Sequence, residues 1–457
     1  MTQNLNKRYG LPTAICMVIG IVIGSGIFFK TEAVLKTTGG NVLTGVFSLI
    51  IIGLIMFFCE YSFSILAGKY GKMNGVVDYA EATCGKKYAF YLGWFMTFIY
   101  TPALTSVLGF VSAMYFGSLF GFTANSGETM TLAALFLIVD AFLNAVSPKL
   151  AGKTQISTTV IKLIPLILMA IVGIFHGLTS GQLLTNFAPS FHTTSPILGS
   201  LCASVVSLSF AFEGWILVTS INSELKNAKR NLPLALIWGS IAVVAIYVFY
   251  YLGICGAISI DDLMAHGSTY AFKQLFGNIF GTLLTVFITI SCLGTMNGLM
   301  MANSRNMYSL AIRGNGPKVS LFSHVDKTTN MPINSTFLAS LLSIVWLVYY
   351  FGANLSNNWF GLFSFDSSEL VVITMYAMYI PIFCQMFHDT ELVPWKRYLL
   401  PALSIFSCLF LIGCAFYAHG IVKFQQASLN GTFAFPVLFY LILTFGILYV
   451  GKFFYNK

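Results

Sequence analysis

The sequence predicts an all-α integral membrane protein that crosses the bilayer with twelve helices and forms a single membrane domain over residues 1–457. Three observations predict this class: the composition, the length of the apolar runs and the placement of the charges. Hydrophobic residues make up 57% of the chain and charged residues only 9%, with a mean hydropathy of +0.81. Because about a quarter of the residues of a soluble domain are charged, this composition excludes a soluble globule.

The apolar residues gather into runs that are long enough to span a membrane. A spanning helix needs about 20 mostly apolar residues, and twelve such runs follow one another with short connections. The predicted spans are 12–37, 42–68, 88–120, 129–147, 156–178, 197–222, 233–257, 278–312, 335–352, 359–388, 396–421 and 433–455.

The placement of the basic residues predicts the orientation. The net charge is +9, but no aromatic-interleaved patch gathers the 24 Lys and Arg, so a nucleic-acid partner is not expected. Twelve spans put both termini on one side, and most basic residues lie on that side, which identifies it as the cytoplasm. We therefore expect a multi-pass protein of the cell membrane, inner or plasma, with both termini cytoplasmic. The exceptions are Lys30, Lys36, Lys273 and Lys423, which we assign to the outer side, and Lys162, which we assign to the membrane interior.

The first predicted span contains three glycines in its middle, Gly20, Gly24 and Gly26. Each glycine weakens a helix by about 1 kcal/mol relative to alanine, so the backbone can leave helical geometry around Ser25. The spacing of Gly20 and Gly24 fits a helix-packing face equally well. Taken alone, this segment leaves both interpretations open.

The sixth predicted span has a second candidate break at residues 209–215, where Glu213 precedes Gly214. An acidic residue next to a glycine at mid-membrane is hard to explain as packing. The first and sixth spans would each open a five-helix half, and interruptions at matching positions of two halves indicate a transporter binding site. The pair of breaks therefore favours a site over a packing face.

Several motifs resemble the amino acid–polyamine–organocation (APC) superfamily of transporters, and in particular its L-amino-acid-transporter branch. They are GSGIF at 24–28, ELKNAKRNLP at 224–233, SCLGTMNG at 291–298, Ser304-Arg305 and RGNGP at 313–317. The resemblance implies a LeuT-like core of five-plus-five inverted repeats, over about 12–178 and 197–388, followed by two extra helices over about 396–455. It also implies alternating access, with helices one and six interrupted and a substrate site between helices one, three, six, eight and ten.

Lys162 is the one basic residue that we assign to the membrane interior. It matches a helix-five lysine of the branch, where the resemblance implies that an ammonium takes the place of the sodium ion used by sodium-coupled relatives. Snorkelling to the interface is the alternative. We expect Lys162 to be a coupling or structural cation that holds helices one, five and eight together.

Glu213 departs from the pattern of relatives that bind neutral amino acids, which usually carry glycine there. A carboxylate at this depth would favour a cationic amine or bind a proton, and a neutral hydrogen-bonded carboxyl is the alternative. The expected substrate-binding residues are Ile23, Gly24, Ser25, Gly26, Phe210, Ala211, Phe212, Glu213 and Trp215.

Two further pairs are candidates for the site. Asp366 and Glu369, spaced i, i+3, are expected on one face of the outer third of helix ten, where they would attract a cation to the external vestibule; an exposed helix end is nearly as good an explanation. Ser291 and Asn297 are the candidates on helix eight.

These residues predict a sodium-independent antiporter of amino acids or amines, with a cationic amine such as agmatine or putrescine as the favoured substrate. The alternative is an exchanger or proton symporter of small neutral amino acids. The six histidines form no metal motif, and no catalytic residue, metal or other cofactor is expected, so an enzyme is not predicted. A channel would need a continuous polar ring. The resemblance implies that a glycoprotein subunit, where one exists, is joined through a cysteine between helices three and four. Residues 117–130 contain no cysteine, so this disulfide-linked subunit is not expected, and the chain is predicted to act alone, as a monomer, in the lipid bilayer.

Overall fold

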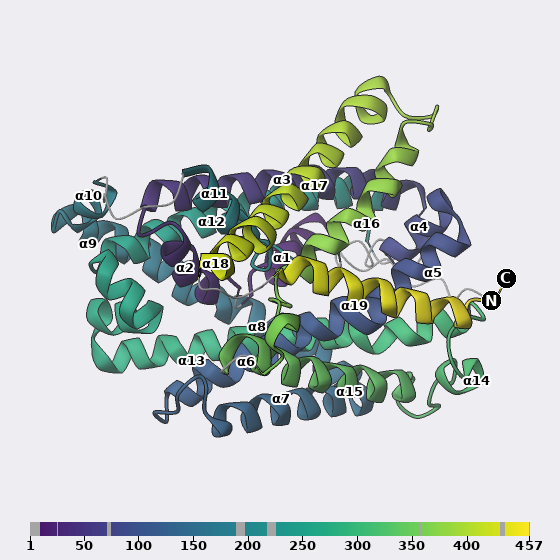
Figure 1. The fold of residues 1–457 in the computed structure, drawn as a ribbon, viewed down its shortest axis with the longest axis horizontal. Helices are drawn as coiled ribbons and strands as arrows, with labels where there is room; N and C mark the ends of the chain where they lie inside the picture. Colours follow the sequence, from purple (N-terminus) through teal and green to yellow (C-terminus); the bar gives the residue numbers. More distant parts are fainter. Residues whose placement is uncertain are drawn as a thin grey trace.

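The computed structural model describes residues 10–24, 26–70, 75–188, 197–216, 225–356, 359–429 and 435–456. All regular elements in these ranges are helices. Most run roughly along the long axis of the molecule, with α9 and α10 at one end and α4 and α14 at the other (Figure 1).

The elements of the first half begin with α1 (Leu11–Val22) and α2 (Gly26–Thr37), which together correspond to the first predicted span. They continue with α3 (Val42–Lys69), α4 (Val76–Cys84), α5 (Lys86–Phe95), the π-helical turn η1 (Met96–Tyr100), α6 (Thr101–Ser118), α7 (Gly127–Val146), α8 (Pro148–Leu168), the π-helical turn η2 (Met169–Gly173), α9 (Ile174–Thr179) and α10 (Gln182–Phe187).

The second half contains α11 (Ile197–Ser209), α12 (Ala228–Ala257), α13 (Ile260–Ile312), α14 (Val319–Phe322), α15 (Ile333–Tyr350), η4 (Phe351–Leu355), η5 (Gly361–Phe363) and α16 (Leu370–Met386). It ends with η6 (Trp395–Leu399), α17 (Leu400–Ala415), the π-helical turn η7 (Phe416–Val422), α18 (Lys423–Leu429), α19 (Pro436–Gly451) and η8 (Lys452–Phe454).

Local sequence explains where several helices begin and bend. The side chains of Asn41, Ser126 and Ser259 accept hydrogen bonds from backbone amides of the turns that follow them, as N-caps do. The π-helical turn η1 comes directly before Thr101-Pro102, where proline lacks the amide that a regular helix needs. In α13 the backbone turns at Gly267 and Gly277, whose φ angles of 73° and 78° are favourable only for glycine.

The interior is formed by helices that are distant in sequence. α12 packs against α1 and α3, and α13 packs against α6 and α8. Large apolar side chains are meanwhile exposed on the outer surface, among them Ile279 (83% exposed) and Phe337 (73% exposed). A surface of this kind fits contact with lipid, since large exposed apolar areas are rare on soluble monomers.

Nine helical segments of the described residues are long and apolar enough to cross a membrane. They are 42–69, 86–118, 127–146, 157–179, 228–257, 260–312, 333–355, 395–429 and 436–454. The other predicted spans coincide with the α1–α2 pair and with the shorter helices α11 and α16. Because these are shorter than an uninterrupted spanning helix in the described part, the total of twelve stays a prediction.

Candidate substrate-binding site

The first predicted span leaves helical geometry where its glycines are. α1 ends at Val22, Ile23 is extended with φ −70° and ψ 101°, and α2 begins at Gly26. A β-carbon on Gly26 would lie 2.5 Å from the Cα of Ala211, and one on Gly24 would lie 2.6 Å from Oγ1 of Thr295. The break therefore touches both the sixth predicted span and α13. Ser25, an expected substrate-binding residue, lies outside the described residues.

The second break follows α11. This helix ends at Ser209, residues 210–212 form a turn, and Gly214 has a φ of +100°, which glycine adopts without strain. Together with the approach of Gly26 to Ala211, this brings the two predicted breaks side by side. Ile23, Ala211 and Phe212 are buried there.

Carbonyl oxygens released by the two breaks meet a single hydroxyl. The hydroxyl of Tyr247 on α12 lies 3.1 Å from the carbonyl oxygen of Val22 and 3.0 Å from that of Ala211. It carries one proton, so it donates to one carbonyl at a time. The ring of Tyr247 also packs edge-on against Phe212, with centroids 5.0 Å apart. Sequence reasoning missed Tyr247, because nothing in the sequence distinguishes it from the other tyrosines among the 22 in the chain.

Lys162 lies on the α1 side of the first break. Its ammonium donates to the carbonyl oxygen of Gly20 at 2.7 Å and to Oγ1 of Thr295 at 3.4 Å. Because α1 ends at Val22, the carbonyls of its last turn lack the amide partners of a continuous helix. Lys162 supplies one of the missing donors. The side chain is fully buried, so it does not snorkel to an interface.

Glu213 is held at the second break by a residue of the third predicted span. Tyr100, the last residue of η1, donates its hydroxyl hydrogen bond to Oε1 of Glu213. Oε2 is buried and has no hydrogen-bond partner among the described residues. Trp215 follows and donates to the hydroxyl of Tyr376 on α16 at 3.2 Å. One of the two carboxylate oxygens of Glu213 thus accepts a hydrogen bond and the other does not, and aromatic side chains surround the group. Tyr100 was also missed, although Pro102 nearby is a signal for an irregular helix.

The two candidates on α13 differ in their surroundings. Ser291 is fully buried, and its hydroxyl has no partner among the described residues. Asn297 accepts a hydrogen bond of 3.0 Å from Asn144 on α7, which also donates to the backbone carbonyl of Asp140. Asn297 is therefore joined to α7, whereas we expected it to face the site.

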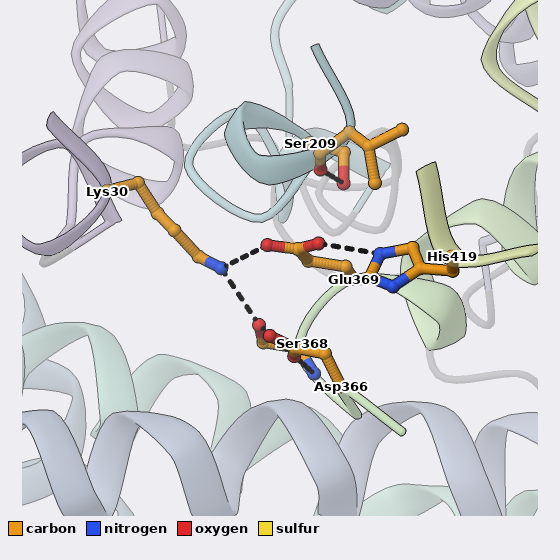
Figure 2. Close-up of polar contacts among 7 residues, drawn as sticks. Lys30, Ser209, Asp366, Ser368, Glu369 and His419 are labelled. Atoms are coloured by element: carbon orange, nitrogen blue, oxygen red, sulfur yellow. Dashed lines mark hydrogen bonds and ion pairs between the residues drawn. The ribbon is translucent and has the colours of Figure 1, made fainter. Parts of the chain in front are cut away.

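Asp366 and Glu369 do not share a helix face, because α16 begins only at Leu370. Asp366 lies in the preceding turn and accepts hydrogen bonds from the backbone amide and hydroxyl of Ser368 at 2.7 and 2.6 Å. Glu369 is buried and forms an ion pair of 2.7 Å with Lys30 of α2 (Figure 2). The expectation that these carboxylates are free to attract a cation is not met, because protein groups already occupy them.

Two further residues complete this cluster. Lys30 of α2, which we assign to the outer side, is 3% exposed, with its ammonium 5.8 Å from the ring centroid of Phe210. His419 lies inside η7, where Nε2 is 2.8 Å from Oε2 of Glu369. We name Lys30, Asp366, Ser368, Glu369 and His419 the outer cluster, from the predicted orientation. Its parts are far apart in sequence, so spacing could not indicate it.

The family model described as "Amino acid permease" matches residues 9–447 of the chain. The chain belongs to the amino acid permease family. Members of this family are transporters and not enzymes. The predicted resemblance to the APC superfamily is thereby confirmed, and the coarse function of the chain is amino acid transport across a membrane.

Curated relatives agree over most of their length. The serine/threonine exchanger SteT of Bacillus subtilis is 28% identical over 432 residues, covering 90% of this chain and 91% of that protein. The human cystine/glutamate transporter is 26% identical and covers 91% and 81%. The human large neutral amino acids transporter small subunit 2 is 27% identical and covers 75% and 64%. The crystal structure of MhsT in complex with L-phenylalanine superposes with a TM-score of 0.58 at 16% identity, covering 89% of this chain and 98% of that one. This likeness shows the LeuT-like fold.

Proposed function

We propose that this permease is a sodium-independent exchanger of small neutral amino acids that works by alternating access. The substrate would lie between the α1–α2 break and the break after α11. The free amides at the start of α2 suit its carboxylate, and the carbonyls at the end of α1 suit its ammonium group. The predicted five-helix halves, 12–178 and 197–388, would rock about this site.

We infer a neutral substrate chiefly because protein groups already contact the acidic side chains. Glu369 is neutralised by Lys30, Asp366 is used by Ser368, and Tyr100 donates to Glu213. Of these three acidic residues, only Glu213 therefore offers a buried carboxylate oxygen without a partner among the described residues to an amine with extra positive charge. The names of the relatives, a serine/threonine exchanger and a large neutral amino acids transporter subunit, favour the same class.

A cationic amine such as agmatine or putrescine is the second candidate. It rests on Oε2 of Glu213, which is buried without a hydrogen-bond partner in the described structure. An ammonium group of the substrate would satisfy this oxygen. The relatives favour the neutral class, so we rank this candidate second.

The absence of a sodium requirement rests on Lys162. Its ammonium joins α8 to the end of α1 and, through Thr295, to α13. A fixed positive charge at this junction performs the bridging that a bound cation would otherwise supply. We further propose that the permease acts without a glycoprotein subunit and as a monomer, with both termini in the cytoplasm.

Uptake into proteoliposomes in sodium-free buffer tests this function. Labelled alanine, serine, arginine, agmatine and putrescine are compared for the natural chain and for Glu213→Gln. We expect alanine and serine to be carried by both, since a glutamine oxygen still accepts the Tyr100 hydrogen bond. Uptake of putrescine that is lost in Glu213→Gln would reverse the ranking of the two candidates.

Lys162→Met tests the cation, with Lys423→Met as its matched control because Lys423 is exposed. We expect Lys162→Met to lower exchange at least about tenfold, as loss of one buried charged hydrogen bond allows, and Lys423→Met to leave it unchanged. A strict dependence of the natural chain on sodium would contradict the role given to Lys162.

A further inference from the structure

The outer cluster presents one carboxylate to two basic groups. Oε1 of Glu369 is 2.7 Å from the ammonium of Lys30, and Oε2 is 2.8 Å from Nε2 of His419. Figure 2 shows the two basic side chains reaching Glu369 from opposite sides. They come from different elements, since Lys30 is on α2 and His419 is on η7. Glu369 therefore joins three parts of the molecule.

The cluster lies next to the proposed substrate site. Lys30 follows the α1–α2 break by one helical turn, and its ammonium lies 5.8 Å from the ring centroid of Phe210 in the second break. It also donates to the hydroxyl of Ser368 at 3.0 Å, which in turn donates to Asp366. The ion pair thus fixes α2, one half of a broken helix, to the start of α16. Moving α2 away from α16 requires this pair to separate.

The charges around His419 can be counted from the described residues. η7 packs against α11, α17, α18 and α19. Their only charged side chain among the described residues is the exposed Lys423 of α18; the titratable ones are Cys202, Cys408 and Cys414 and the tyrosines of α19. Lys30, Glu369 and Asp366 of the outer cluster remain. With neutral His419 these three sum to one negative charge, and one proton would balance them.

We propose that His419 is a binding site for a proton from the outer solution and that this proton releases Lys30 from Glu369. A charged imidazolium and the Lys30 ammonium compete for the same carboxylate. When α2 leaves, Glu369 loses its ammonium partner, and a protonated His419 takes its place at the other oxygen. The open arrangement therefore holds the proton more tightly than the closed one.

The sign of the coupling follows from linkage. A ligand that binds the open arrangement more tightly shifts the population towards it. External acid should therefore open the outer side of the permease, and closure should expel the proton back to the same side. This step moves no proton across the membrane. It rests on the alternating access and the orientation proposed above, but it makes no assumption about which amino acid is carried.

A thiol reporter tests this without any substrate. Ser209 is 1% exposed and ends α11, which packs against α2, α16 and η7. In reconstituted Ser209→Cys protein, labelling of that residue by a membrane-impermeant methanethiosulfonate is followed by peptide mass spectrometry. External pH is set on either side of the range in which histidine titrates, at about 5.5 and about 8. The same measurement on Ser209→Cys/His419→Gln corrects for the reactivity of the thiol itself.

After this correction, we expect labelling to be faster in acid by about fivefold or more, a typical coupling between two sites. His266→Gln is the matched control, because His266 is exposed and belongs to a predicted outer segment, and it should leave the acid effect intact. Lys30→Met, made in the Ser209→Cys protein, should give fast labelling of that cysteine at both pH values. A corrected ratio of one or less, or slow labelling in Lys30→Met, would overturn the proposal.

Discussion

Two charged clusters at different places in the molecule use opposite designs. In the outer cluster, one carboxylate, Glu369, is shared by Lys30 and His419. In a second cluster, which we name the inner cluster, one guanidinium, Arg313, is shared by Asp78 and Glu81 at 2.5 and 3.3 Å. Arg313 follows α13 and both acids belong to α4, so this cluster fixes the end of α13.

The difference indicates which of the two clusters can respond to pH. An arginine side chain stays charged at every physiological pH, so the inner cluster keeps its cation. The outer cluster contains a histidine, the residue type that proteins use as a pH switch. The ion pairs of the inner cluster therefore do not depend on pH in the physiological range, whereas the outer cluster contains a basic group that becomes charged when it binds a proton.

The largest expected effect is that of Arg313→Met. It leaves two carboxylates without their guanidinium, one of them on Asp78, which is 5% exposed. Removing one partner of a buried ion pair costs about 3–5 kcal/mol, so we expect a marked drop in the melting temperature of the detergent-solubilised protein. Lys229→Met is the matched control, because Lys229 is exposed. Equal melting temperatures of the two variants would contradict the role of the inner cluster.

A smaller effect with a characteristic pH dependence is expected for Lys30→Met. At about pH 8 the loss should be about 1–3 kcal/mol, smaller than for Arg313→Met because one carboxylate loses its cation and Glu369 keeps its hydrogen bond to His419. At about pH 6 the proton that we propose for His419 supplies the missing charge, so the variant should recover part of its stability. Thermal melts at both pH values measure this. Arg313→Met should show no such recovery, and a Lys30→Met defect that grows in acid would contradict the account.

The smallest effect is expected for Lys69→Met. Lys69 ends α3 and pairs with Asp389 and Glu391 at 2.7 and 2.8 Å, but its own side chain is 30% exposed and that of Glu391 is 77% exposed. Such surface pairs contribute at most about 1 kcal/mol and are screened by salt. A melting-temperature loss as large as that of Arg313→Met, or one that persists unchanged in high salt, would show that burial does not separate these clusters.

Sequence reasoning reached the features that local patterns encode. Gly24, Gly26 and Gly214 mark where a helix is weakened, and the structure leaves helical geometry in these segments. Lys162 stood out because a charge within an apolar run has few explanations. It contacts Gly20 and Thr295, and its role as a coupling or structural cation stays a prediction. Each of these signals is contained in a stretch of a few residues.

What sequence reasoning missed depends on contacts between distant segments. The i, i+3 spacing of Asp366 and Glu369 indicated a common helix face, but the helix starts after both. The partners of Glu369 are Lys30 and His419, 339 and 50 residues away. No local pattern shows that an acid already has its cation, so Glu213, Asp366 and Glu369 suggested a cationic substrate, which the names of the relatives do not favour.

The central claim is sodium-independent exchange of small neutral amino acids, and trans-stimulation tests it most directly. Proteoliposomes in sodium-free buffer are loaded with unlabelled serine or left empty, and the entry of labelled serine is followed. The account predicts rapid entry into serine-loaded vesicles and little entry into empty ones. Equal entry into both, entry that appears only when sodium is added, or stimulation by internal putrescine but not by serine would contradict it.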